Sequence, residues 1–163
     1  MIITLDDKDR ILLDQLQGNA RLTSSELGKQ IDLSTSGVQK RLRKLEENGV
    51  VEKYATIINR KRLGYDLLVF VQVTLAGHMP ELVAAFDTAM QEMPEILECH
   101  RVTGNADYLL KIVVRDHEHL DHFLMQRLLP LPSIDRVSSN LVLKAVKETT
   151  NIGLVEAENN NHQ

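Results

Sequence analysis

The chain has 163 residues, a hydrophobic share of 43% and a formal net charge of −4. This length suits one medium domain or two small ones, and an aromatic share of 4% implies an aliphatic core. No apolar run of membrane-spanning length and no secretory signal are recognisable. The single Cys99 excludes an intrachain disulfide and a cysteine zinc site. We therefore expect a cytoplasmic protein with no membrane partner.

The charge is distributed unevenly along the chain. Residues 1–62 hold 12 Lys and Arg against 9 Asp and Glu, whereas residues 63–163 hold 7 against 14. Because only the first part is positively charged, we interpret the chain as two domains with different partners. The predicted organisation is a first domain at 1–58, a basic linker at 59–66, a second domain at 67–150 and a polar, disordered tail at 151–163.

Three short helices are predicted in the first domain. Acidic residues favour the start of a helix at about 7–17, and Thr23 with Glu26 forms a capping-box pattern that starts a second helix. A third helix follows a short turn and ends near Glu47. This spacing is typical of a helix-turn-helix, and the β-rich segment at 50–58 is expected to be a wing or a connecting strand. The buried stripe of the third helix is predicted to be Val38, Leu42 and Leu45.

The third helix also carries a polar face suited to DNA. Its Lys and Arg residues can neutralise phosphates, Gln39 can read a base edge, and the N–H groups at its start can meet a phosphate. The alternative, an ordinary solvated face, is disfavoured by the helix-turn-helix pattern and the local positive charge. Arg41 borders the buried stripe, so it either joins this face or pairs with a carboxylate of its own domain. The predicted DNA-binding residues are Ser34, Thr35, Ser36, Gln39, Lys40, Arg43 and Lys44.

Strands and helices alternate in the second domain. Strands are predicted at 67–75, 96–103, 107–115 and 134–147, and helices at 80–93 and 118–129. The order βαββαβ predicts a ferredoxin-like sheet with both helices on one face. The apolar content of the strands suggests that the other face is covered, most simply by a second copy of the chain. The predicted fold class is α+β, a three-helix, winged helix-turn-helix domain followed by a ferredoxin-like domain.

A tight polar turn joins the two middle strands of the second domain at 102–108 (VTGNADY). Gly104 allows positive φ and close approach of the backbone. The side chains of Thr103, Asn105 and Asp107, together with turn N–H groups, offer partners for the carboxylate and ammonium groups of an amino acid. Spacing alone nevertheless favours an ordinary hairpin loop, because Gly-Asn is common turn chemistry.

Neither a metal site nor a catalytic site is predicted. The cluster at 117–122 (HEHLDH) is dense in His and carboxylates, but its geometry is poor for a metal and a solvated helix face explains it more simply. Cys99 and His100 are neighbours on a strand, so their side chains point to opposite faces and cannot form a nucleophile–base pair. Phosphate-binding glycine loops and nucleophile elbows are also absent from the sequence. We expect no enzyme activity and no cofactor.

Three segments of the chain resemble the Lrp/AsnC (leucine-responsive regulatory protein, feast/famine) family of transcription regulators. They are 5–21 (LDDKDRILLDQLQGNAR), 33–59 with its LEENGVVEKY exit from the third helix, and 96–116 with the motif ECHRVTGNADYLLK. The last is the most specific. The chain departs from the family at Gly37, where a helix-favouring residue is more usual, and at Asn105, where an acidic residue is common.

The resemblance implies a sequence-specific regulator whose helix-turn-helix binds double-stranded DNA. It further implies a homodimer, assembling to an octamer, whose second domain senses a small-molecule effector, commonly an amino acid. The remaining alternatives are an oligomeric interaction protein without a specific DNA target and a small-molecule enzyme. In the family the effector lies at an interface between dimers, near the loop matching Thr103, Gly104, Asn105, Asp107 and Tyr108, which overrides the ordinary-hairpin interpretation.

Overall fold

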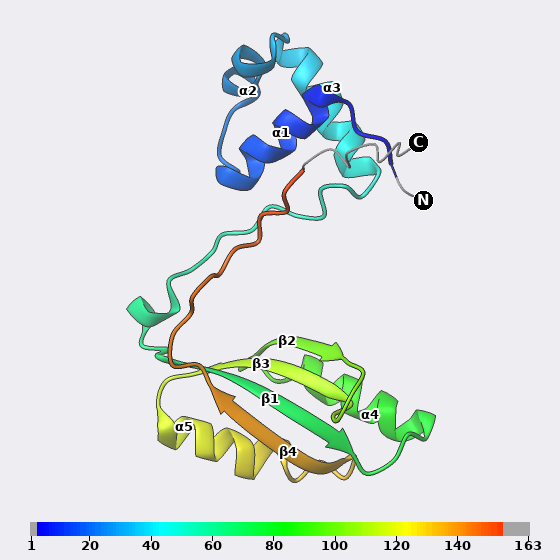
Figure 1. Cartoon of the computed structure of the whole chain (residues 1–163), viewed down its shortest axis with the longest axis vertical. Coiled ribbons are helices and arrows are strands. Elements are labelled where there is room, and N and C mark those ends of the chain that lie inside the picture. The colour runs from blue at the N-terminus through cyan, green and yellow to red at the C-terminus, as the bar shows by residue number, and fades with distance from the viewer. Residues whose placement is uncertain (1–2, 155–163) are drawn as a thin grey trace, which may run out of the picture. The chain divides into compact units, whose positions relative to one another are not determined.

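The computed structural model describes residues 3–154, which form two compact units (Figure 1). The first unit contains the chain up to Ile57 together with the segment that begins at Lys147, and the second contains Ile58–Val146. The predicted linker at 59–66 thus falls in the second unit, where the 3-10 helix η1 (Arg60–Leu63) forms. No helix among the described residues is long and apolar enough to cross a membrane.

The first unit is a bundle of three short helices, α1 (Asp7–Gly18), α2 (Ser24–Ile31) and α3 (Thr35–Glu47). The predicted capping box at the start of α2 is present, since Thr23 Oγ1 accepts from Glu26 N and Glu26 Oε2 accepts from Thr23 N. A second capping box, between Asp6 and Asp9, starts α1. The core of the unit is aliphatic and is formed by Leu12, Leu27, Ile31 and Val38.

The turn between α2 and α3 depends on a glycine inside α2. Leu33 N donates to Gly28 O at 3.0 Å, and Asp32 adopts a left-handed conformation with φ of 51°. A Cβ atom at Gly28 would overlap the carbonyl oxygen of Leu33. The close approach of the turn to α2 therefore requires glycine at this position, and it sets the direction in which α3 leaves α2.

The second unit is a four-stranded antiparallel sheet with helices on one face (Figure 1). The strand order β2-β3-β1-β4 is that of a ferredoxin-like fold, which confirms the predicted βαββαβ architecture. Its elements are β1 (Leu67–Leu75), α4 (Pro80–Gln91), β2 (Ile96–Arg101), β3 (Tyr108–Val114), α5 (His117–His122) with a π-helical continuation η2 (Phe123–Leu128), and β4 (Ile134–Leu141).

The core of this unit lies between the sheet and the helices. Alternate residues of the central strands, such as Val71 of β1 and its neighbour Leu110 of β3, point to this side and pack with Phe86 and Phe123. By the same alternation the opposite face mixes apolar and polar side chains. Its apolar part is formed by Leu68, Phe70, Leu109 and Val113.

Two predicted strands differ from those observed. Residues 52–59 are extended but form no strand, because no neighbouring strand pairs with them in the described chain; strand propensity alone does not make a sheet. Strand β4 ends at Leu141 and not at 147, since its partner β1 begins at Leu67 and the ladder of hydrogen bonds has no continuation beyond that end.

The C-terminal segment also differs from the expected tail at 151–163. Ile152 N donates to Gln17 Oε1 at 2.6 Å, and Gln17 Nε2 donates to Ile152 O at 3.1 Å. The segment thereby returns to α1 of the first unit, while residues 155–163 lie outside the described residues.

Candidate functional site

Helix α3 is positioned by a cap at its start and a buried stripe along its length. Ser34 Oγ accepts from Gly37 N at 3.1 Å and lies 3.1 Å from Ser36 Oγ. Val38 and Leu45 are buried as predicted, and Leu42 is half-buried. The hydroxyl of Ser34 is therefore used to begin the helix, which leaves its neighbours to face solvent.

The side of α3 away from this stripe is exposed and basic. At roughly 100° per residue, Thr35, Gln39 and Arg43 form one row, and Ser36 and Lys40 form the next. Within residues 3–154, no carboxylate is ion-paired with a basic side chain of this face. The positive charges are thus available to an external anion. All seven predicted DNA-binding residues are exposed, namely Ser34, Thr35, Ser36, Gln39, Lys40, Arg43 and Lys44.

Arg41 takes the structural role that the sequence left open. Its Nη1 atom lies 2.6 Å from Asp6 Oδ2 and 2.7 Å from Asp9 Oδ1. Hydrogen bonding to Arg41 lowers the pKa of Asp6, and the same bond raises the pKa of Arg41. Arg41 therefore joins α3 to the capped start of α1 and does not belong to the exposed basic face.

Tyr54 attaches the segment that follows α3 to the end of that helix. Its hydroxyl donates to Glu46 Oε1 at 2.8 Å, and partial burial with this bond raises the pKa of Tyr54 to about 12. Sequence reasoning missed this contact, because it treated 50–58 as a strand. The sequence did contain a hint of this bond, namely a Tyr eight residues after a Glu that lies near the end of a helix.

The 102–107 turn of the second unit has an exposed tip. Val102 N donates to Asp107 O at 2.9 Å, and Gly104 has a φ of 119° that favours glycine. Thr103 and Asn105 are exposed and make no side-chain hydrogen bond with any residue in the described ranges. The tip therefore presents polar groups to solvent.

Asp107 binds within its own unit. Its Oδ2 accepts from Leu75 N at 2.8 Å, and its Oδ1 lies 2.8 Å from His78 Nε2. The bond to His78 is the largest cause that lowers the pKa of Asp107. Both carboxylate oxygens thus connect the turn to the end of β1. Sequence reasoning missed His78, which lies in a loop with no motif of its own.

Tyr108 points away from the turn and toward the helices. It is 4% exposed, its ring lies 4.5 Å from that of Phe86, and its hydroxyl donates to Asp87 Oδ1 at 3.0 Å. Burial, with a smaller effect of Asp87, raises the pKa of Tyr108. The structure therefore separates Tyr108 from Thr103 and Asn105, with which it had been grouped.

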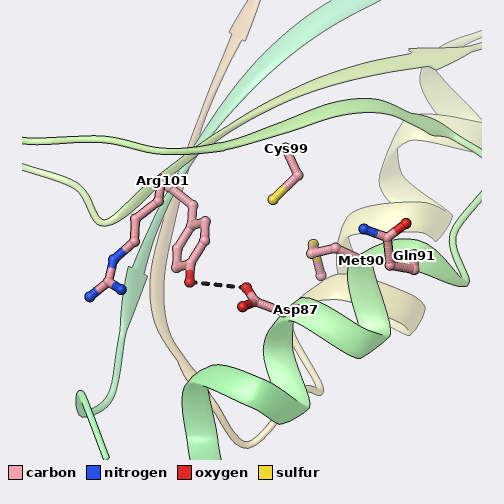
Figure 2. A pocket seen from close by; sticks show the side chains of 6 residues that line it. Asp87, Met90, Gln91, Cys99 and Arg101 are labelled. Carbon is pink, nitrogen blue, oxygen red and sulfur yellow. Dashed lines mark hydrogen bonds between the residues drawn. The ribbon is translucent and has the colours of Figure 1, made fainter. Parts of the chain in front are cut away.

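A pocket of about 330 Å³ lies where Tyr108 meets α4 (Figure 2). Asp87 and Gln91 come from α4, and Cys99 and Arg101 come from the edge strand β2. Met90 completes the lining. Burial raises the pKa of the Cys99 thiol to about 11, so the thiol is protonated near neutral pH. Sequence reasoning did not group these residues.

The histidine cluster at 117–122 has ordinary structural contacts. Asp116 Oδ1 accepts from His119 N at 2.8 Å and caps α5, and His119 Nε2 lies 3.6 Å from Glu95 Oε1. The part of the chain that the structure describes contains no group of three or more His, Cys, Asp or Glu side chains arranged to hold a metal ion.

Comparisons with known proteins match both units. Residues 5–52 match a winged helix-turn-helix DNA-binding model, and residues 68–152 match the Lrp/AsnC ligand binding domain. The leucine-responsive regulatory protein of Escherichia coli K12 is 37% identical over 148 residues, which cover 91% of this chain and 90% of that protein.

Solved structures of transcription regulators are also similar to this chain. A transcriptional regulator of Neisseria meningitidis, in complex with L-Met, is 34% identical with a TM-score of 0.89, covering 93% of this chain and 97% of the other. AsnC of Escherichia coli is 26% identical with a TM-score of 0.84, covering 91% and 99%. Together with the capped basic helix and the ferredoxin-like unit, these matches show that the chain belongs to the Lrp/AsnC family of DNA-binding transcription regulators, with a ligand-binding domain.

Proposed function

We propose that this regulator binds a near-palindromic DNA site as a homodimer in the cytoplasm, and that an amino acid controls its assembly or its affinity for DNA. The observation that carries the DNA part is the exposed basic face of α3, the second helix of the helix-turn-helix. Two such helices from a dimer enter successive major grooves.

Each residue of this face has a proposed role. Lys40, Arg43 and Lys44 neutralise phosphates, and Thr35, Ser36 and Gln39 read base edges. Ser34 contributes indirectly, because its hydroxyl caps the helix whose first N–H groups face the phosphate backbone. One copy of this face is a small footprint, so we propose that specificity comes from its repetition in a dimer.

The ligand-binding domain supplies the control. The complex of the Neisseria regulator with L-Met supports an amino acid as the effector class. We propose Thr103, Gly104, Asn105, Asp107 and Tyr108 as the effector region and a contact between dimers as its location, with homodimers assembling to octamers. Ligand bound there changes how dimers pack, and hence the spacing of their DNA-binding units. On the sheet face away from the helices, the half-buried Phe70 and Leu109 support pairing with a second copy.

The DNA proposal is tested by selecting fragments from genomic DNA with the full chain and measuring their retardation in gels. We expect specific retardation that Arg43→Ala weakens roughly tenfold or more. Arg136→Ala is the matched control, since Arg136 is an exposed arginine of β4 in the second unit. Absence of specific fragments, or equal effects of the two variants, contradicts the proposal.

The effector proposal is tested by calorimetry of the full chain with each of the twenty amino acids, followed by size-exclusion chromatography with light scattering. We expect one or a few amino acids to bind and to change either the oligomeric state or the affinity for the selected fragments. If no amino acid binds, the effector part of the proposal fails and the DNA part stands by itself.

A further inference from the structure

The basic residues at 60–62 form the helix η1, which is closed by hydrogen bonds at both ends. At its start, Asn59 Oδ1 accepts from Arg62 N at 3.3 Å. At its end, Gly64 has a φ of 79° and its N–H group donates to Lys61 O at 3.1 Å. Three consecutive basic side chains are therefore held on one short helical turn.

Two arginines near this turn are held by neutral partners. Arg60 Nη1 donates to Tyr65 O at 2.6 Å and to Asp66 O at 2.8 Å. The guanidinium of Arg115, which directly follows β3, lies 5.7 Å from the centre of the Tyr65 ring. Main-chain carbonyls and an aromatic face orient a guanidinium without neutralising it as a carboxylate would. Both arginines therefore keep a positive charge that can act on a partner outside the chain.

Four basic side chains gather where β1 begins and β3 ends. Leu67 of β1 pairs with Val114 of β3, so the residue after β3 lies beside the segment that precedes β1. Within residues 3–154, no carboxylate is ion-paired with any of these four side chains. The first of the four is half-buried and the others are exposed. We refer to them as the η1 patch, which consists of Arg60, Lys61, Arg62 and Arg115.

The η1 patch concentrates positive charge on a unit that is acidic as a whole. The second unit, Ile58–Val146, holds 9 Lys and Arg against 11 Asp and Glu, and four of the nine belong to the patch. Two of the remaining five are ion-paired, because Lys111 binds Glu98 and Arg127 binds Glu95. Local, unpaired positive charge of this kind suits a polyanion such as the phosphate backbone of DNA.

The length of chain between α3 and η1 sets how far apart their DNA contacts can lie. Twelve residues separate Glu47, the last residue of α3, from Arg60, the first of η1. An extended chain of this length spans at most about 45 Å. Since B-DNA rises roughly 3.4 Å per base pair, this distance corresponds to about a dozen base pairs. Phosphates that flank the bases read by α3 are therefore within reach of the patch.

We propose that the η1 patch binds the phosphate backbone of the DNA that flanks the site read by α3. Lys61, Arg62 and Arg115 contact phosphates, and Arg60 fixes the turn that presents them. The inference rests on the DNA-binding function of the helix-turn-helix and enlarges its footprint without adding base readout. Such contacts carry no sequence information, so they raise the affinity for every DNA sequence alike.

A series of duplex lengths tests the patch directly. The full chain is titrated, by fluorescence anisotropy, with a selected fragment trimmed to its binding site and with the same site extended by about 15 base pairs on each side, which exceeds the reach of the patch. We expect the wild type to bind the longer duplex roughly tenfold more tightly. The double variant Lys61→Gln, Arg62→Gln should lose most of this gain and bind the trimmed duplex as the wild type does.

The salt dependence of binding gives a second readout. On the longer duplex, the slope of log affinity against log salt should fall by about two per chain in the double variant and by about one in Arg115→Gln. The matched control is the double variant Ala85→Glu, Gln126→Glu, which changes the net charge equally at exposed positions of α4 and η2. We expect this control to keep the wild-type slope and the wild-type gain from flanking DNA.

The outcomes separate the η1 patch from the function of α3. If the selected fragment binds specifically and Arg43→Ala weakens it, but flanking DNA gives no gain or the control loses as much as the patch variant, the patch assignment is overturned and the regulator function stands. If no fragment is selected, the proposed reading by α3 fails. The same comparison on mixed-sequence duplexes then decides the patch, and an unchanged salt slope there overturns it.

Discussion

The two candidate sites differ in how their side chains are held. On α3 the functional face is set by helical periodicity, because residues that are not buried against α1 and α2 face outward. Of the seven predicted contacts, only Ser34 and Ser36 have side-chain hydrogen bonds within the described residues, and these lie at the start of the helix. In the 102–108 segment, the chain changes direction, and Asp107 and Tyr108 turn inward to partners far away in sequence. A regular element thus reveals its functional face in its sequence, whereas a turn does not.

The largest expected effect concerns the turn that aims α3. Gly28→Val places a side chain against the carbonyl oxygen of Leu33, so we expect the first unit to lose about 2 kcal/mol of stability and DNA binding to fall with it. Gly18→Ala is the matched control, because nothing lies within 4 Å of a Cβ atom there. Thermal unfolding of both variants tests this; equal melting temperatures would show that α3 is aimed by other contacts.

Two substitutions on α3 distinguish base reading from phosphate binding. Gln39→Ala is expected to cost about 1–3 kcal/mol on the preferred sequence and to relax the preference at one base pair. Lys44→Ala is expected to weaken binding to all sequences alike and to lower the salt-dependence slope by about one per helix bound. Fluorescence anisotropy against a panel of single-base variants at several salt concentrations separates them. Identical behaviour of the two variants is incompatible with the proposed roles.

The structure of the 102–108 segment is tested through the hydrogen bond that Asp107 Oδ2 accepts from Leu75 N at the end of β1. Asp107→Ala leaves Leu75 N without its acceptor, and we expect a loss of about 1–2 kcal/mol in local stability. Amide hydrogen exchange at Leu75 should therefore accelerate roughly tenfold, with exchange in α1–α3 unchanged. His78→Ala should show a smaller acceleration, since it removes one of the two partners of the carboxylate. Unchanged exchange at Leu75 in Asp107→Ala would show that this bond does not hold the turn to the end of β1.

The smallest expected effect is electrostatic and lies in the first unit. The pKa of Asp6 is lowered in the folded state by Arg41, so the pair stabilises the fold above the unfolded pKa of about 4, and this contribution is lost as the pH falls through the folded pKa. Asp6 is about half exposed, so we expect at most about 1 kcal/mol. Melting temperatures of wild type and Arg41→Met, measured from about pH 6 to pH 2, should converge at the acid end. A difference that is constant with pH would assign the effect of Arg41 to packing.

The sequence predicted those features that depend on local pattern. Thr23 and Glu26 identified the start of α2 because a capping box is a local exchange of hydrogen bonds, and alternating apolar residues identified the strands of the sheet. The absence of a strand at 50–58 and the early end of β4 were not predictable in this way, because a strand exists only where a second strand pairs with it.

The candidate sites likewise divide into features set by local sequence pattern and features set by distant partners. Exposure of Lys40 and Arg43 follows from the buried stripe of their own helix, whereas the partners of Asp107 and Tyr108 lie 32 and 21 residues away. Asp87 carries no signal in the sequence, since an acid on an amphipathic helix is normally solvated. Such partners are fixed by the packing of α4 against the sheet, which no local pattern contains.

The paired hydrogen bonds between Gln17 and Ile152 have a consequence for how the molecule is made. Their partners are separated by 135 residues, so during synthesis α1, α2 and α3 leave the ribosome long before Ile152 exists. The core of the helix-turn-helix contains no residue of the C-terminal segment, so it can form before the chain returns to α1. A nascent chain stopped at residue 146 therefore has every residue of the core around α1, α2 and α3 but lacks the hydrogen bonds between Gln17 and Ile152.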